Sequence, residues 1–139
     1  MTLIVQKYGG TSVGSIDRIR SVAERVRICR DRGDRVVVVV SAMSGETDRL
    51  IALAQGIHDR PNPRELDVLL STGEQVTIAL LSMALESLGC PAKSYTGGQV
   101  HIRTDSAHSK ARILDINGAR VRSDLDAGRA VTGRGLGER

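Results

Sequence analysis

Aromatic residues are almost absent from this sequence, which has two tyrosines, no phenylalanine and no tryptophan among its 139 residues. Proteins that bind single-stranded nucleic acid usually stack the bases on aromatic side chains, so this class of function is disfavoured. The core has to be built from valine, isoleucine, leucine, alanine and methionine instead. Such a core is typical of an α/β protein with buried parallel strands.

Long runs of one charge are also missing. Lysine and arginine together number 20 against 16 acidic residues, which gives a formal net charge of +4. These residues are spread along the chain, and no run reaches the length of a nucleic-acid-binding arm. We therefore expect no nucleic-acid partner.

Cysteine is scarce, and targeting signals are missing. Cys29 and Cys90 have neither a metal-binding spacing nor the pattern of a disulfide framework, so we expect free thiols in a reducing compartment. The three histidines also lack a metal-ligand spacing. The N-terminus lacks the basic region of a signal peptide, and we expect no segment long enough to span a bilayer. These absences predict a cytoplasmic protein with no membrane partner and no metal site formed by protein ligands.

The first forty residues have the pattern of a strand, a helix and a second strand. An apolar strand over Leu3–Val5 leads into a loop rich in glycine and hydroxyl residues, Gly9–Gly14. Ser15 is suited to cap a helix that ends near Gly33. The apolar face of this helix is predicted to contain Ile16, Ile19, Val22, Ala23 and Val26. The unbroken valine run Val36–Val40 indicates a strand buried on both faces.

Helices are expected to dominate the middle of the chain. After the loop Ser41–Asp48 we predict a helix to about His58, and then a longer helix over about Arg64–Leu88. Because glycine weakens a helix, a kink or break is expected at Ser71–Gly73. Ser71 or Thr72 would then cap the segment that carries Glu74.

The last third is predicted to contain short strands at "AKSYT", "QVHIRT" and "ARILDI", followed by a helix over Asn117–Ala127. Residues 130–139 are rich in glycine and arginine with almost no apolar pattern. We therefore expect no buried strand there.

Two loops at the carboxyl ends of the predicted strands are candidates for a ligand site. Lys7–Ser12 and Ser41–Thr47 are both rich in glycine and hydroxyl groups, and ligands of open α/β sheets bind at this edge. Glycine lets backbone N–H groups approach phosphate oxygens, and Lys7 would add a positive charge. A glycine pair after a strand is also an ordinary tight turn, and neither common phosphate-binding spacing is present. Glu74 is a third candidate, although an acid in the first turn of a helix also serves as a cap.

Four segments together resemble the amino-terminal part of the aspartate kinases: "VQKYGGTSVGS", "VVVVSAMSGETDRL", "RELDVLLSTGEQVTIALLSMAL" and "SYTGGQVHIRTDSAHSKARI". The resemblance implies the amino acid kinase fold, a three-layer αβα sandwich. It also implies transfer of the γ-phosphoryl group of ATP to the β-carboxylate of L-aspartate. The product is 4-phospho-L-aspartate, at the start of lysine, threonine and methionine biosynthesis. Mg²⁺ would accompany ATP, coordinated mostly by phosphate and water.

The resemblance also implies roles for individual residues. Lys7 would contact the transferred phosphoryl group, and Tyr8, Gly9, Gly10 and Ser41 would lie at the phosphates. The substrate-binding positions would be Thr47, Glu74, Leu125 and Asp126. Full-length members of the family oligomerise, whereas the sequence does not indicate an oligomeric state for this chain.

The resemblance ends near Arg129. Family members continue with a strand and a segment reading T-L-G-R-G-G-S-D-T, where this chain has "AVTGRGLGER". We therefore divide the chain into residues 1–129, the amino-terminal part of an amino acid kinase domain, and residues 130–139, an aberrant tail. Arg134 is not given the role of the family's carboxylate-binding arginine. The chain is expected to be a truncated, weakly active or inactive fragment.

Two alternatives remain open from the sequence. One is another amino acid kinase that acts on glutamate, N-acetylglutamate, carbamate or a nucleotide, although the "STGEQ" block around Glu74 argues for aspartate. The other is a non-catalytic remnant that binds a nucleotide or a partner chain.

Overall fold

The structure is a computed structural model that describes residues 2–96, 101–104, 113–117 and 119–134. A four-stranded parallel sheet in the order β1-β2-β6-β3 forms its centre. These strands are β1 (Leu3–Tyr8), β2 (Arg35–Val40), β3 (Ala92–Tyr95) and β6 (Ala130–Gly133). A separate antiparallel pair is formed by β4 (His101–Thr104) and β5 (Ile113–Asn117).

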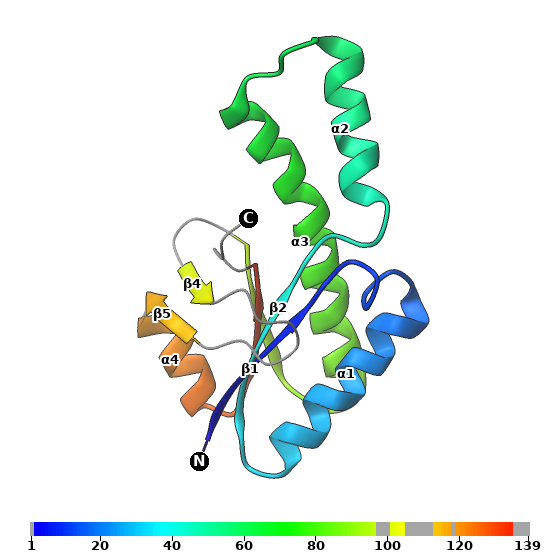
Figure 1. Cartoon of the computed structure of the whole chain (residues 1–139). Coiled ribbons are helices and arrows are strands. Elements are labelled where there is room, and N and C mark those ends of the chain that lie inside the picture. Colours follow the sequence, from blue (N-terminus) through cyan, green and yellow to red (C-terminus); the bar gives the residue numbers. More distant parts are fainter. Residues whose placement is uncertain (1, 97–100, 105–112, 118, 135–139) are drawn as a thin grey trace.

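Helices cover both faces of the parallel sheet (Figure 1). Helices α1 (Ile16–Asp31) and α3 (Pro63–Ser87) pack on one face, and α4 (Ala119–Asp126) packs on the other. Helix α2 (Glu46–Ile57) and the first half of α3 extend beyond the carboxyl ends of the strands. This arrangement confirms the expected α/β class with three layers.

Helix α1 forms as its sequence predicts. The Ser15 side chain accepts a hydrogen bond from the Arg18 backbone N–H at 3.2 Å. The helix ends just before Gly33, whose φ of 91° favours glycine. Four of the five residues predicted for the buried face are buried, and Ile16 is exposed: the buried four are Ile19, Val22, Ala23 and Val26.

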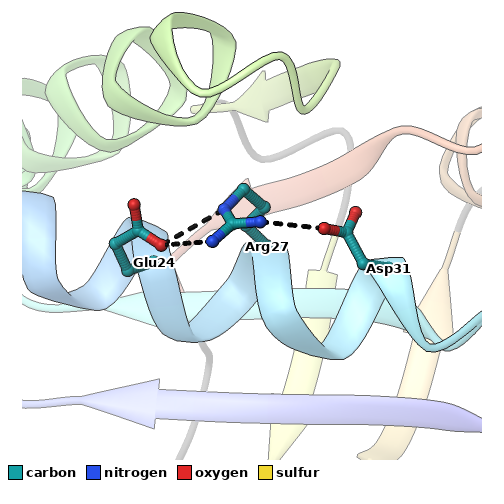
Figure 2. A network of polar contacts seen from close by, with 3 residues as sticks. All are labelled: Glu24, Arg27 and Asp31. Carbon is teal, nitrogen blue, oxygen red and sulfur yellow. Dashed lines mark hydrogen bonds and ion pairs between the residues drawn. The ribbon is translucent and has the colours of Figure 1, made fainter.

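Charged side chains stabilise the outer face of α1. Arg27 pairs with Glu24 at 2.7 Å and with Asp31 at 3.0 Å, one turn away on either side (Figure 2). Pairs at these spacings contribute a few tenths of a kcal/mol each, roughly 0.2–0.5. The buried apolar face therefore contributes most to the docking of this helix.

Helix α3 is continuous, so the predicted break at Ser71–Gly73 is wrong. The Ser71 and Thr72 hydroxyls donate to the carbonyls of Val68 and Leu69 within the same helix, at 2.7 and 2.6 Å, and cap no new segment. Gly73 has a packing role. A Cβ there would lie 3.1 Å from the Ala42 Cβ, so glycine allows α3 to lie close to the loop after β2.

By length and composition alone, α3 is also apolar enough to cross a membrane, contrary to the expectation that no segment is long enough. Core helices of soluble proteins pass the same test. Ile78, Leu81 and Leu85 of α3 are fully buried against the sheet, whereas Val68, Val76 and Met83 of the same helix are exposed.

Strand β6 lies in the glycine- and arginine-rich stretch from residue 130, where the sequence predicts no buried strand, so that prediction is wrong for residues 130–133. The strand occupies the middle of the sheet between β2 and β3. Ala130, Val131 and Thr132 are at most 1% exposed, and the Thr132 and Ser82 hydroxyls are 2.7 Å apart. The four small residues of β6 lie between Arg129 and Arg134, and so short a segment has too few apolar residues to predict a strand. Residues 130–134 thus belong to the fold, while residues 135–139 lie outside the described part.

Candidate active site

The two loops predicted to bind a ligand lie side by side at the carboxyl edge of the sheet. The Ser41 backbone N–H donates to the Tyr8 carbonyl at 3.2 Å, and the Ser44 N–H donates to the Gly10 carbonyl at 3.1 Å. Two segments more than thirty residues apart in sequence therefore form one backbone surface.

The two adjacent glycines of the first loop have different surroundings. A Cβ on Gly10 would lie 2.9 Å from the Ala42 carbonyl oxygen, closer than real Cβ contacts. Glycine at this position is thus required for the contact between the loops. Gly9 is exposed and has nothing within 4 Å of a Cβ position. Together with the exposed Thr11 and Ser12, it forms a part of the loop that is open to a ligand.

Lys7 belongs to a row of residues that crosses the whole sheet. Strand pairing aligns Lys7, Val39, Gly133 and Tyr95. Neighbouring strands are about 4.8 Å apart, so the backbones of Lys7 and Gly133 are separated by roughly 10 Å. Because side chains alternate along a strand, Lys7 faces the same side as Val5, which packs against α4.

The Tyr8 side chain points to the opposite face. It is 7% exposed within the core formed with α1 and α3, and its hydroxyl donates to Gln6 Oε1 at 2.8 Å. Burial raises the pKa of this phenol, and nearby Arg25 partly opposes the shift. Only the Tyr8 backbone reaches the candidate site.

The second loop places the start of α2 at the same edge. Gly45, with a φ of 82°, precedes the helix, and Thr47 is exposed in its first turn. The Arg49 guanidinium donates two hydrogen bonds of 2.5 and 3.1 Å to the Glu46 carboxylate, which lowers the pKa of Glu46. Because α2 begins at this edge, the positive end of its dipole points toward the candidate site.

Glu74 reaches the carboxyl edge from α3. Its neighbour Gly73 packs against Ala42 and Glu46. Arg134, directly after β6, places its Nε 3.4 Å from Glu74 Oε2, and both side chains are about one quarter exposed, at 25% and 23%. The sequence does not indicate this pair, because it does not predict strand β6.

Leu125 and Asp126 are not brought to this edge. Leu125 is 4% exposed and packs with Val121 against the sheet. Asp126 pairs with Arg35 at 2.7 Å, at the amino end of β2. Both predicted substrate-binding residues thus lie at the opposite end of the strands from Lys7.

Tyr95 is an additional polar group in the row of Lys7. Its hydroxyl donates to the carboxylate of Asp124 on α4, which also pairs with Arg129 at 3.0 Å. Burial and the Asp124 carboxylate together raise the pKa of Tyr95 to about 12. A tyrosine at the end of a short strand carries no sequence signal of such a contact.

The sequence model of the amino acid kinase family matches residues 2–137 of this chain. The chain belongs to this family. It is 67% identical over 136 residues to an aspartokinase of Pseudomonas aeruginosa, a match that covers 98% of this chain and 33% of the relative. The chain therefore spans about a third of the length of the curated aspartokinases it matches.

Solved structures agree with this family fold. An aspartate kinase from Synechocystis is similar with a TM-score of 0.80 and 48% identity, over 98% of this chain and 22% of that one. E. coli aspartokinase III, solved in complex with aspartate and ADP, matches with a TM-score of 0.71 and 20% identity, over 99% of this chain and 41% of that one. At this lower identity the likeness is one of fold.

Proposed function

We propose that this chain is the amino-terminal part of an aspartate kinase, which transfers the γ-phosphoryl group of ATP to the β-carboxylate of L-aspartate. The observation that carries the proposal is the 67% identity to a Pseudomonas aeruginosa aspartokinase across nearly the whole chain. The carboxyl edge supports it, because that edge combines a lysine, an open glycine backbone and a helix N-terminus. The protein would act in the cytoplasm, in the first step of lysine, threonine and methionine biosynthesis.

The phosphoryl donor would bind at the two loops. Phosphoryl transfer depends mainly on alignment and on neutralising the charge that spreads over the transferred group. Lys7 supplies a mobile positive charge, and the Gly9 backbone and the Ser41 hydroxyl supply hydrogen-bond donors. Among the described residues, no three acids, histidines or cysteines form a metal cluster, so Mg²⁺ would arrive with the nucleotide and be held mainly by phosphate oxygens.

The acceptor would bind beside Thr47 and Glu74. Glu74 offers a carboxylate for the ammonium group of L-aspartate, and the exposed Thr47 hydroxyl offers a hydrogen bond. An oxygen of the substrate β-carboxylate would attack the γ-phosphorus, and the bond to the bridging oxygen would break as ADP leaves. Leu125 and Asp126 have no part in this proposal, since they lie at the other end of the strands.

The test is aspartate-dependent ADP release by the longest chain that the source produces. Lys7→Met should lower kcat by about a hundredfold or more, because a charge that acts in the transition state is lost. Lys93→Met, at an exposed position of β3, is the matched control and should retain activity. Equal turnover in the two variants would contradict the role of Lys7. Turnover with glutamate, N-acetylglutamate or carbamate in place of aspartate would contradict the proposed acceptor.

The 139 residues alone should show little or no turnover. The aspartokinases that the chain matches are about three times as long. Binding and catalysis are therefore best measured separately, with calorimetry for the short chain and ADP release for the longest one.

A further inference from the structure

Arg134 contacts the Glu74 carboxylate, which under the proposed function binds the ammonium group of L-aspartate. The Nε–Oε2 distance is 3.4 Å, and neither side chain is fully buried. A guanidinium and an ammonium group satisfy a carboxylate in the same way, through charge and N–H donors. The two cations would therefore compete for one acceptor.

The backbone holds this arginine at the site. Arg134 follows directly after Gly133, which is paired with Val39 on one side and Tyr95 on the other. The opposing carboxylate is also held in place, because Glu74 follows Gly73, which packs tightly against Ala42 and Glu46. Both partners thus extend from well-anchored backbone.

We infer that Arg134 is an internal competitor of the substrate, and that its guanidinium must leave Glu74 before the α-ammonium group of an amino acid can bind there. This inference rests on the proposed function. It adds a regulatory contact within the same chain, which tunes substrate affinity through the strength of one partly exposed ion pair. A dicarboxylic acid without an amino group would not have to displace the arginine.

The effect of removing the competitor should be modest. Partly exposed ion pairs are weak, so Arg134→Gln should tighten L-aspartate binding by about twofold to tenfold, where tenfold equals 1.4 kcal/mol. Succinate has both carboxylates of aspartate but lacks the ammonium group. Its binding should stay unchanged or weaken, because the variant leaves Glu74 negative and no longer paired with Arg134.

The experiment is calorimetric titration of the 139-residue chain and its Arg134→Gln variant with L-aspartate and with succinate. Arg64→Gln is the charge-matched control, since Arg64 pairs with Glu65 at the start of α3 and is 85% exposed. Circular dichroism checks that each variant is folded. Tighter aspartate binding in Arg134→Gln alone, with no gain for succinate, is the expected result.

Equal or weaker aspartate binding in Arg134→Gln would overturn the inference, as would an equal gain for both ligands. No binding to either chain would overturn it too. The proposed function is decided independently, by turnover of the longest chain, so the two failures can be distinguished.

Discussion

At the scale of the residue, Gly10 is the position where one added methyl group has the clearest consequence. A Cβ would lie 2.9 Å from the Ala42 carbonyl oxygen, and backbone cannot move aside as a flexible side chain can. Gly10→Ala should therefore destabilise the fold by about 1–3 kcal/mol. It should also separate the loop of Lys7 from the loop of Ser41. Urea unfolding measures the first effect and nucleotide binding the second.

Gly9→Ala is the matched control for this prediction. No atom lies within 4 Å of its Cβ position, so the stability should change by no more than about 0.5 kcal/mol. Similar losses of stability in the two variants would show that the contact between the loops is not what requires Gly10.

Tyr95 gives a prediction for alkaline pH. Its pKa rises from 10.0 to about 12 in the folded chain, so the folded state holds the phenol proton more tightly than the unfolded state. The resulting stabilisation is complete below pH 10 and is lost as the pH rises from 10 to 12. Tyr95→Phe should therefore show a smaller loss of stability over this range than the parent chain.

The measurement is absorbance of the phenolate, which only two tyrosines can contribute. Titration of Tyr8→Phe isolates Tyr95, and titration of Tyr95→Phe isolates Tyr8. If Tyr95 titrates near pH 10 in the folded chain, its contact with Asp124 does not persist in solution.

At the scale of the element, two glycines in helices should respond in opposite directions. Gly73 of α3 would place a Cβ 3.1 Å from the Ala42 Cβ, so Gly73→Leu should force α2 and α3 apart and cost about 1–3 kcal/mol. Gly56 of α2 is exposed with open space around it, so Gly56→Ala should stabilise by about 0.5–1 kcal/mol. Thermal unfolding measures both, and stabilisation by Gly73→Leu would contradict the packing role.

Most elements could be predicted from the sequence because their patterns are local. The cap at Ser15, the apolar face of α1 and the valine run of β2 depend only on neighbouring residues. Gly73 misled the prediction, because a glycine that permits close packing looks the same in sequence as one that breaks a helix. The difference depends on Ala42, which is distant in sequence.

At the scale of the whole molecule, β6 connects β3 to the rest of the sheet. Val131 is fully buried and faces the core formed with α4. Val131→Asp would bury an unpaired charge and should cost roughly 4–5 kcal/mol or more, a large share of the about 5–15 kcal/mol by which folded chains are stable. Val68→Asp is the control, since Val68 is 56% exposed. Equal free energies of unfolding for Val131→Asp and Val68→Asp, measured by urea unfolding, would contradict the central position of β6.

The sequence predicts those site residues that lie at the ends of recognisable strands, but not the contacts that depend on how distant elements pack together. The sequence identified Lys7 and the two loops, because parallel strands bring their carboxyl ends to one edge. It could not reveal that Arg134 approaches Glu74, since this requires a strand that it did not indicate. Leu125 and Asp126 came from resemblance alone, and the structure places them at the far edge.

The strand order also has a consequence in time. β6 joins β2 in the middle of the sheet, but it is complete only when residue 133 has been synthesised. β2 ends at residue 40, so 93 further residues must be added before β6 is complete, which takes roughly 5 to 19 s at about 5–20 residues per second. Throughout that interval the edge of β2 that β6 will cover, with its five valines, lacks its β6 partner. Uncharged β-branched segments with open edges associate readily with one another, so the nascent chain should depend on chaperones more than its small size suggests.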